Sequence, residues 1–145
     1  MRAAIESLSE GAIMALLKDV KGFGLPWEES YGFAQAVKVD DTIYVSGQLG
    51  LDDQGKMIYS NMETQMRQTY ANAKKILSQF GATLENVVEE VLYVTDMETA
   101  FAAAGPVRKE AYGSKTPAVA STILVTPRLS LPTQLIEIKF IAKVR

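Results

Sequence analysis

The sequence contains neither cysteine nor histidine among its 145 residues. The first absence excludes disulfides, a thiolate nucleophile and cysteine-ligated metals, and the second removes the commonest general base and metal ligand of proteins. Long apolar runs are also lacking. The stretch AIMALL at 12–17 is too short to span a membrane, and it does not have the pattern of a secretory leader. We therefore expect a soluble, cytoplasmic protein with no metal site.

The charge of the chain is small, and its composition is that of a folded protein. The formal net charge is −2, so the broad positive field that binds nucleic acid is missing. Hydrophobic residues make up 48% and charged residues 22%, which is ordinary for a globular domain. The length fits one domain over 1–145, in which 1–30 form an N-terminal arm. We expect a small-molecule ligand, and neither nucleic acid nor a membrane as partner.

The first part of the chain predicts an arm followed by a β-hairpin. Residues 2–20 carry apolar positions at mixed helical spacing, which favours a short helix or an irregular arm. Glycines and a proline predict a loop over 22–32. The β-rich runs at 33–39 and 42–50 flank two aspartates at 40–41, which is the pattern of a hairpin.

The rest of the chain alternates between helical and strand patterns. A helix is predicted over 61–81, with Asn at its start and Gly at its end, and a valine-rich strand over 87–96. A second helix over 98–112 contains Pro106, which either kinks it or restarts it. Alternating apolar residues predict a strand over 135–144.

This order of elements predicts an α+β domain, with helices over one face of a sheet. Two helices cannot cover both faces of such a sheet. The other face is most simply covered by self-association, and closed cyclic oligomers are the usual result.

Two side chains are candidates for chemistry. Glu137 lies between Ile136 and Ile138, where burial would raise its pKa and suit it to activate water. A cross-strand ion pair is the alternative. Ser46 precedes the flexible Gly47, where a hydroxyl and backbone N–H groups could hold an oxyanion, although a simple strand end or bulge also fits. A nucleophilic Ser46 is disfavoured because the chain has no histidine to activate it.

The segment 116–132, TPAVASTILVTPRLSLP, combines apolar residues with four hydroxyl side chains and has no charge before Arg128. It is either a buried strand or the wall of a binding site, with Ser121 and Thr122 on opposite faces. Arg128 could pair with a ligand carboxylate, but a lone loop arginine is usually a solvated charge.

Several motifs in sequence order resemble the RidA/YjgF (endoribonuclease L-PSP-like) family over about 31–145. They are VDDTIYVSGQLGLDDQGK at 39–56, VVEEVLYVTDMETAF at 87–101, TPA at 116–118 and IEIKFIA at 136–142, with a helical set between them at Gln65, Asn72, Ile76, Leu77 and Gly81. The resemblance implies the chorismate-mutase-like fold, a mixed, mainly antiparallel sheet with two helices on one face. It also implies a homotrimer with clefts between subunits, and hydrolysis of enamines and imines to keto acids and ammonia without a cofactor.

The resemblance assigns site roles residue by residue. Ser46 matches the family's site serine, and Glu137 matches the glutamate that positions the attacking water. Phe33 stands where deaminating members have tyrosine, and Gly105 where they have asparagine. Val119 stands where they have the arginine that grips the substrate carboxylate.

Ser121 stands where members of the family often have Cys or Thr. Arg128 is a candidate substitute for the missing arginine. Losing the bidentate contact between this arginine and a substrate carboxylate would weaken the binding free energy by roughly 1.5 to 3 kcal/mol. The predicted cleft is thus lined by Phe33, Ser46, Gly47, Gly105, Val119, Ser121, Arg128 and Glu137. Two functions remain open: a cofactor-independent deaminase for a less anionic imine, or a non-catalytic, metabolite-binding or regulatory trimer. A plain assembly protein with a vestigial cleft is a third possibility.

Overall fold

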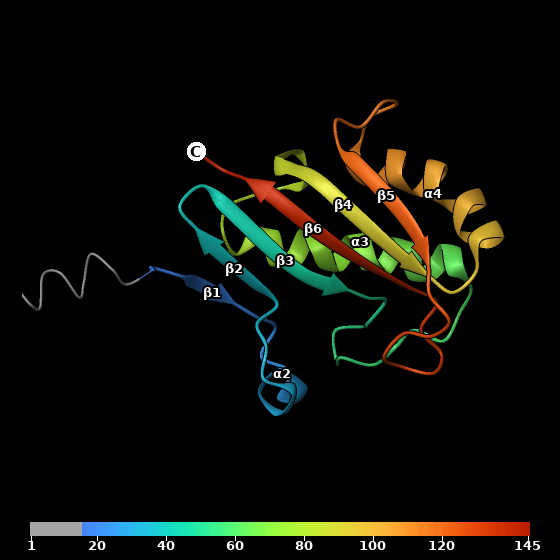
Figure 1. The fold of residues 1–145 in the computed structure, drawn as a ribbon, viewed down its shortest axis with the longest axis horizontal. Helices are drawn as coiled ribbons and strands as arrows, with labels where there is room; N and C mark the ends of the chain where they lie inside the picture. The colour runs from blue at the N-terminus through green and yellow to red at the C-terminus, as the bar shows by residue number, and fades with distance from the viewer. Residues whose placement is uncertain (1–15) are drawn as a thin grey trace, which may run out of the picture.

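The computed structural model describes residues 16–145, which contain one six-stranded sheet in the order β1-β2-β3-β6-β4-β5 (Figure 1). Neighbouring strands are antiparallel except for β4 and β5, which are parallel. The predicted mixed, mainly antiparallel sheet is therefore confirmed. The strands are β1 (Asp19–Lys21), β2 (Ala36–Val39), β3 (Thr42–Gln48), β4 (Val87–Val94), β5 (Ala120–Val125) and β6 (Ile136–Lys143).

The two long helices, α3 (Met62–Ser78) and α4 (Met97–Tyr112), lie against the same face of the sheet (Figure 1). Each begins at a polar cap, because the side chains of Asn61 and Asp96 accept hydrogen bonds from backbone N–H groups of the first turn. Pro106 lies inside α4, which runs through it as one helix and does not restart there. None of the helices within residues 16–145 is long and apolar enough to cross a bilayer.

Two short elements near the N-terminal side differ from the sequence prediction. The sequence predicts a loop over 22–32, but α2 (Pro26–Tyr31) forms there. Proline fits the first turn of a helix, acidic side chains follow it, and Gly32 ends the helix with φ +73°. Residues 19–21 form β1 on the edge of β2 and are not helical. The remainder of the predicted N-terminal helix, residues 1–15, lies outside the described residues.

The core lies between the sheet and the two long helices. The inward face of β6 is fully buried at Ile136, Ile138, Phe140 and Ala142, which confirms the predicted alternation. From α3, Met66, Ile76 and Leu77 pack onto this face. Burial of each such side chain stabilises the fold by roughly 1.5 to 3 kcal/mol.

The predicted strand within 116–132 is shorter and more exposed than a buried strand. β5 covers Ala120–Val125 only, and it is the edge of the sheet. Leu124 and Val125 are 49% and 54% exposed. The buried-strand interpretation is therefore wrong, because no further strand of residues 16–145 pairs with the outer side of β5.

One buried carboxylate joins β4, β5 and both long helices. Glu90 is fully buried and accepts hydrogen bonds from the hydroxyls of Tyr70 (2.8 Å), Tyr112 (3.0 Å) and Ser121 (2.9 Å), and from Arg108. Burial, followed by the charge of Glu90, raises the pKa of both tyrosines well above the ordinary value. Their hydroxyls therefore stay protonated and donate to Glu90. This network fixes β5 to the rest of the fold.

Candidate functional site

A β-bulge at the end of β3 forms the floor of the site. Val45 pairs with Phe140 and Gln48 with Ile138, so Ser46 and Gly47 together oppose a single residue of β6. An extra residue of this kind bends the strand and redirects its side chains. The predicted strand end or bulge is therefore present, and it brings Ser46 and Gly47 close to Glu137.

The Glu137 side chain lies directly over Gly47. A Cβ atom built on Gly47 would come within 2.4 Å of the Glu137 Cδ. Only glycine leaves room for the carboxyl group in this position. The packing of Glu137 thus depends on the absence of a side chain in the bulge.

Glu137 is a desolvated carboxyl group. It is half-buried, and burial raises its pKa above the ordinary value, while the Gln134 amide opposes this shift. No salt bridge of residues 16–145 includes Glu137. The ion pair considered as the alternative is therefore not formed within the described chain, and the group has the properties of a general base or acid.

Ser46 presents an acceptor to the site. Its hydroxyl donates to the carbonyl of Ala34 at 2.7 Å, and its backbone N–H donates to the carbonyl of Gln35 at 2.8 Å. With its proton directed at Ala34, the Ser46 oxygen keeps lone pairs for a ligand. An oxyanion needs a donor, whereas this geometry suits a ligand N–H group.

Glu137, Ser46 and Gly47 line a cavity of about 630 Å³. This volume is in the range of small-molecule binding sites. Most of its other walls are apolar or aromatic, and they come from Trp27, Tyr31, Phe33, Leu49, Leu51 and Leu131, with Gly55 and Ser130 completing the lining. Glu137 is the one charged residue among those that line this cavity in the described part of the chain.

The aromatic wall depends on α2. Trp27 stacks on Phe33 with ring centroids 5.3 Å apart. Glu28 fixes the helix by accepting from the backbone N–H of Phe23 and the amide of Gln35, each at 3.0 Å. Gln35 in turn accepts from Gln48 at 2.9 Å. Two buried amides therefore connect α2 to β3 beside the bulge.

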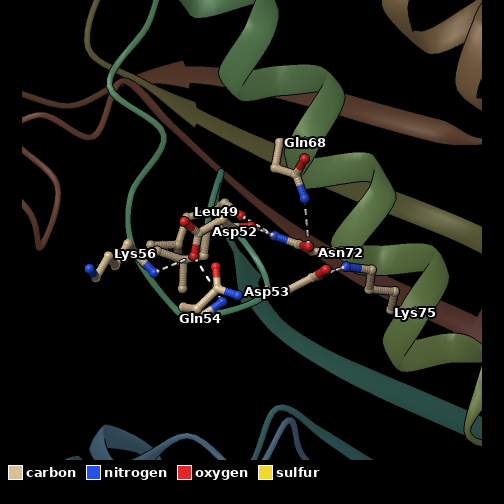
Figure 2. A network of polar contacts seen from close by, with 9 residues as sticks. Leu49, Asp52, Asp53, Gln54, Lys56, Gln68, Asn72 and Lys75 are labelled. Carbon is tan, nitrogen blue, oxygen red and sulfur yellow. Dashed lines mark hydrogen bonds and ion pairs between the residues drawn. The ribbon is translucent and has the colours of Figure 1, made fainter.

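Another wall is the loop 49–57, which polar contacts hold to α3 (Figure 2). The Asn72 amide donates to the carbonyls of Leu49 (2.8 Å) and Leu51 (2.9 Å), and it accepts from Gln68 at 3.0 Å. Asp52 accepts from two backbone N–H groups of its own turn, and Lys75 pairs with the neighbouring Asp53 (Figure 2). The first half of this loop is thus held to α3 at Leu49, Leu51 and Asp53.

The structure brings together four of the eight predicted site residues. Phe33, Ser46, Gly47 and Glu137 line the cavity. The other four do not. Gly105 lies within α4, where an added Cβ atom would meet nothing within 4 Å, and Val119 packs partly buried against the core. Ser121 belongs to the Glu90 network, and Arg128 is exposed in the loop after β5.

Sequence reasoning missed several of the residues that line the cavity. Trp27 falls in the segment that the sequence predicts as a loop, and no motif marks the leucines or Ser130 as site residues. The signal was the cluster of aromatic residues around a Pro-Trp pair, which also predicts a helix start. Among residues 16–145 there is no group of three or more acidic side chains that could hold a metal ion.

Comparison with known proteins shows the family of the chain. The family model described as Endoribonuclease L-PSP matches residues 28–144. A RutC family protein of Pyrococcus abyssi is 33% identical over 87 residues, which are 59% of this chain and 68% of that protein. A 2-iminobutanoate/2-iminopropanoate deaminase of Capra hircus is 36% identical over 90 residues, 61% of this chain and 65% of its own length.

Solved structures of the same family have a similar fold. A Mycobacterium tuberculosis protein of the YjgF/YER057c/UK114 family has 29% identity and a TM-score of 0.74, covering 88% of this chain and all of its own. The RidA structure from an Antarctic Psychrobacter has 30% identity and a TM-score of 0.66, covering 77% and 88% of the two chains. The chain therefore belongs to the endoribonuclease L-PSP family, the RidA/YjgF family that its motifs resemble.

Proposed function

We propose that the protein hydrolyses a reactive imine or enamine to a carbonyl compound and ammonia. The observation that carries this proposal is the pair formed by Glu137 and Ser46 in one cavity, with a desolvated carboxyl group and a free hydroxyl acceptor. Similarity to proteins named as 2-iminobutanoate/2-iminopropanoate deaminases supports the reaction class.

In the proposed reaction, Ser46 accepts a hydrogen bond from the iminium nitrogen and so orients the C=N bond. Glu137 takes a proton from a water molecule as the water oxygen bonds to the iminium carbon, giving a carbinolamine. The proton then passes from Glu137 to the nitrogen, and the C–N bond breaks. The hydroxyl oxygen becomes the carbonyl, and its proton leaves on the released ammonia, so iminium and water yield carbonyl compound and ammonium.

We also propose that the protein is a homotrimer in which the cavity lies at a cleft between subunits. Support comes from the sheet face opposite α3 and α4, which carries exposed apolar groups such as Tyr44 and Leu124, and from the exposed edge β5. In such an assembly, β5 of one subunit would face the cavity of the next. Val119, Gly105 and Arg128 would then belong to the cleft through a neighbour.

A second candidate function is binding without catalysis. It is favoured by the absence of any Lys or Arg among the residues that line the cavity in the described chain, since deaminating relatives are expected to grip a carboxylate there. Ammonia release from imines generated in solution separates the two functions. Acceleration over buffer that disappears in Glu137→Gln supports the deaminase, whereas no acceleration at high protein concentration, for any imine tested, refutes it.

A further inference from the structure

We infer that Glu28 of α2 is a positioning residue for Ser46, which it reaches through the buried side-chain amides of Gln35 and Gln48. The inference rests on the proposed function for its effect on hydrolysis, but the positioning is a property of the folded chain and is measurable without turnover. It concerns the side of the site that one chain forms, and it holds equally when a neighbouring subunit supplies the rest of the cleft.

The Glu28 carboxylate is held in one place. Its Oε2 atom accepts hydrogen bonds from the backbone N–H of Phe23 and from the side-chain amide of Gln35, each at 3.0 Å. Its Oε1 atom lies over Gly22, where a Cβ atom would come within 2.5 Å of it. Gly22 has no positive φ that would itself require glycine, so the requirement is one of space for the carboxylate. Phe23 packs against the core, which anchors this end of the contact.

The carboxylate dictates the orientation of two amides. A carboxylate only accepts hydrogen bonds, so Gln35 turns its NH₂ group to Glu28 and its oxygen away. That oxygen accepts from the NH₂ group of Gln48 at 2.9 Å, and the same NH₂ group donates to the backbone carbonyl of Ser46 at 3.0 Å. Both glutamines are only 2% exposed, so water does not replace a lost partner. Glu28 therefore sets the direction of a hydrogen-bond chain that reaches Ser46.

The backbone beside Gln35 holds Ser46 at two further points. The Gln35 carbonyl accepts from the Ser46 backbone N–H at 2.8 Å, and the Ala34 carbonyl accepts from the Ser46 hydroxyl at 2.7 Å. A shift of Gln35 would therefore move the Ser46 oxygen relative to Glu137. In the proposed reaction these two groups orient the C=N bond and the attacking water, and a displacement of about 1 Å between reacting groups can cost about 100-fold in rate.

Glu28 acts only through other residues. It is not among the residues that line the cavity in the described chain, so its removal takes away no wall of that cavity. Glutamine is the conservative replacement, because one amide oxygen in the place of Oε2 can accept from both Phe23 and Gln35. Alanine offers no acceptor, and it leaves the buried NH₂ group of Gln35 without this partner.

Kinetics test the inference in the full chain. Glu28→Ala should lower kcat for imine hydrolysis about tenfold or more and change KM by less than about threefold, because the walls of the site remain while Ser46 is misplaced. Glu28→Gln should keep kcat within about threefold of the wild type. Gly22→Ala displaces an intact carboxylate and should reproduce the loss of kcat. Glu29→Ala, which removes the neighbouring exposed carboxylate of α2, is the control and should change neither constant.

Hydrogen exchange of the Ser46 amide tests the positioning without turnover. Exchange at Ser46 should quicken about tenfold in Glu28→Ala and Gly22→Ala relative to the amides of β4, and it should stay near the wild-type rate in Glu28→Gln. Wild-type exchange at Ser46 in Glu28→Ala would overturn the inference. So would equal quickening throughout the sheet with an unchanged kcat, which is the result of a merely structural role.

The two measurements separate this inference from the proposed function. Faster exchange at Ser46 together with a lower kcat supports both. Faster exchange at Ser46 with wild-type hydrolysis overturns the catalytic part of the inference while the deaminase function stands. If the wild type hydrolyses no imine, the proposed function is refuted, and faster exchange confined to the region of Ser46 in Glu28→Ala still supports the positioning.

Discussion

The Glu137 carboxyl group occupies the space that a side chain at Gly47 would need, with Cδ only 2.4 Å from the position of a Cβ atom there. Gly47 has no positive φ that would itself require glycine. The requirement is therefore one of space for Glu137, and it ties the conformation of the bulge to the position of the candidate base.

Gly47→Ala should abolish activity and ligand binding with little change in stability. The atoms that clash belong to the Glu137 side chain, which can rotate away, so the free energy of unfolding should change by less than about 1 kcal/mol. Denaturation and imine hydrolysis measured on the same preparation test this. Wild-type hydrolysis in the variant would show that the position of Glu137 over Gly47 is not needed.

Gly105→Ala is the matched change inside α4, where the added methyl group meets nothing within 4 Å. Alanine is a better helix former than glycine, so the free energy of unfolding should rise by roughly 0.5 to 1 kcal/mol. In the proposed trimer Gly105 borders the cleft of a neighbouring subunit, so hydrolysis should fall although the stability rises. Unchanged hydrolysis would place Gly105 outside the site.

Glu137→Gln should raise the stability of the protein at neutral pH. Burial raises the pKa of Glu137, so the folded state holds this proton more tightly than the unfolded chain does. The ordinary pKa of this group is 4.5, and its pKa in the folded protein is higher. As the pH rises from the first pKa through the second, the free energy of unfolding of the wild type falls. Above the second pKa the loss of stability is complete. The melting temperature of the glutamine variant should exceed that of the wild type at pH 7, and the difference should vanish below about pH 4.5. An equal difference at every pH would argue against titration of this group.

Ser121→Ala distinguishes two roles for a predicted site residue. In the structure its hydroxyl donates to Glu90 at 2.9 Å and accepts from Arg108 at 2.9 Å. Removing these contacts should cost about 1 to 2 kcal/mol of stability and, if Ser121 serves only the Glu90 network, leave imine hydrolysis unchanged. Glu90→Ala should cost more, about 3 to 5 kcal/mol, since it leaves Arg108 without its partner. Weaker ligand binding by Ser121→Ala at full stability would restore its predicted role in the site.

Asn72→Ala should loosen the loop wall of the cavity. The Asn72 amide makes hydrogen bonds to the carbonyls of both Leu49 and Leu51, which lie on the cavity wall. Loss of two such bonds should lower the free energy of unfolding by about 2 kcal/mol and weaken ligand binding. Hydrogen exchange of 49–57 measures the loosening, with Lys75→Ala as the control for the exposed pair with Asp53.

Leu124→Lys should dissociate the proposed trimer. Leu124 is 49% exposed on the sheet face opposite α3 and α4, so in a monomer the change should have almost no effect on stability. Light scattering should give three chains for the wild type and fewer for the variant. Phe101→Lys, on the helical side, should leave the mass unchanged. A monomeric wild type would contradict the homotrimer.

The strands and long helices could be predicted because their periodicity is strong and their caps are explicit. The alternation of apolar residues in β6 is typical of a strand with one buried face, and the asparagine before α3 is typical of a helix N-cap. By contrast, α2 buries no residue and has only six residues, so no apolar periodicity marks it. Its signals were the proline at its first turn and the glycine after its last.

The polar residues of the site could be predicted from the sequence, but its aromatic wall could not. Ser46 and Glu137 lie on strands whose pairing follows from the fold, so their proximity could be expected. The aromatic wall required the position of α2, which depends on contacts between distant residues such as Glu28 and Gln35. The hydrogen bond from Ser121 to Glu90 could not be predicted, because a fully buried glutamate on a strand is exceptional and has no local sequence signal.

The position of β6 in the sheet has a consequence for how the site is assembled during synthesis. β6 is later in the sequence than every other strand, yet it lies between β3 and β4 and joins the two halves of the sheet. Until residues 136–143 have been translated, the hairpin of β2 and β3 and the unit formed by β4, α4 and β5 have no common strand to pair with. Glu137 lies on this same segment, so pairing of β6 closes the sheet and completes the candidate site in a single step of folding.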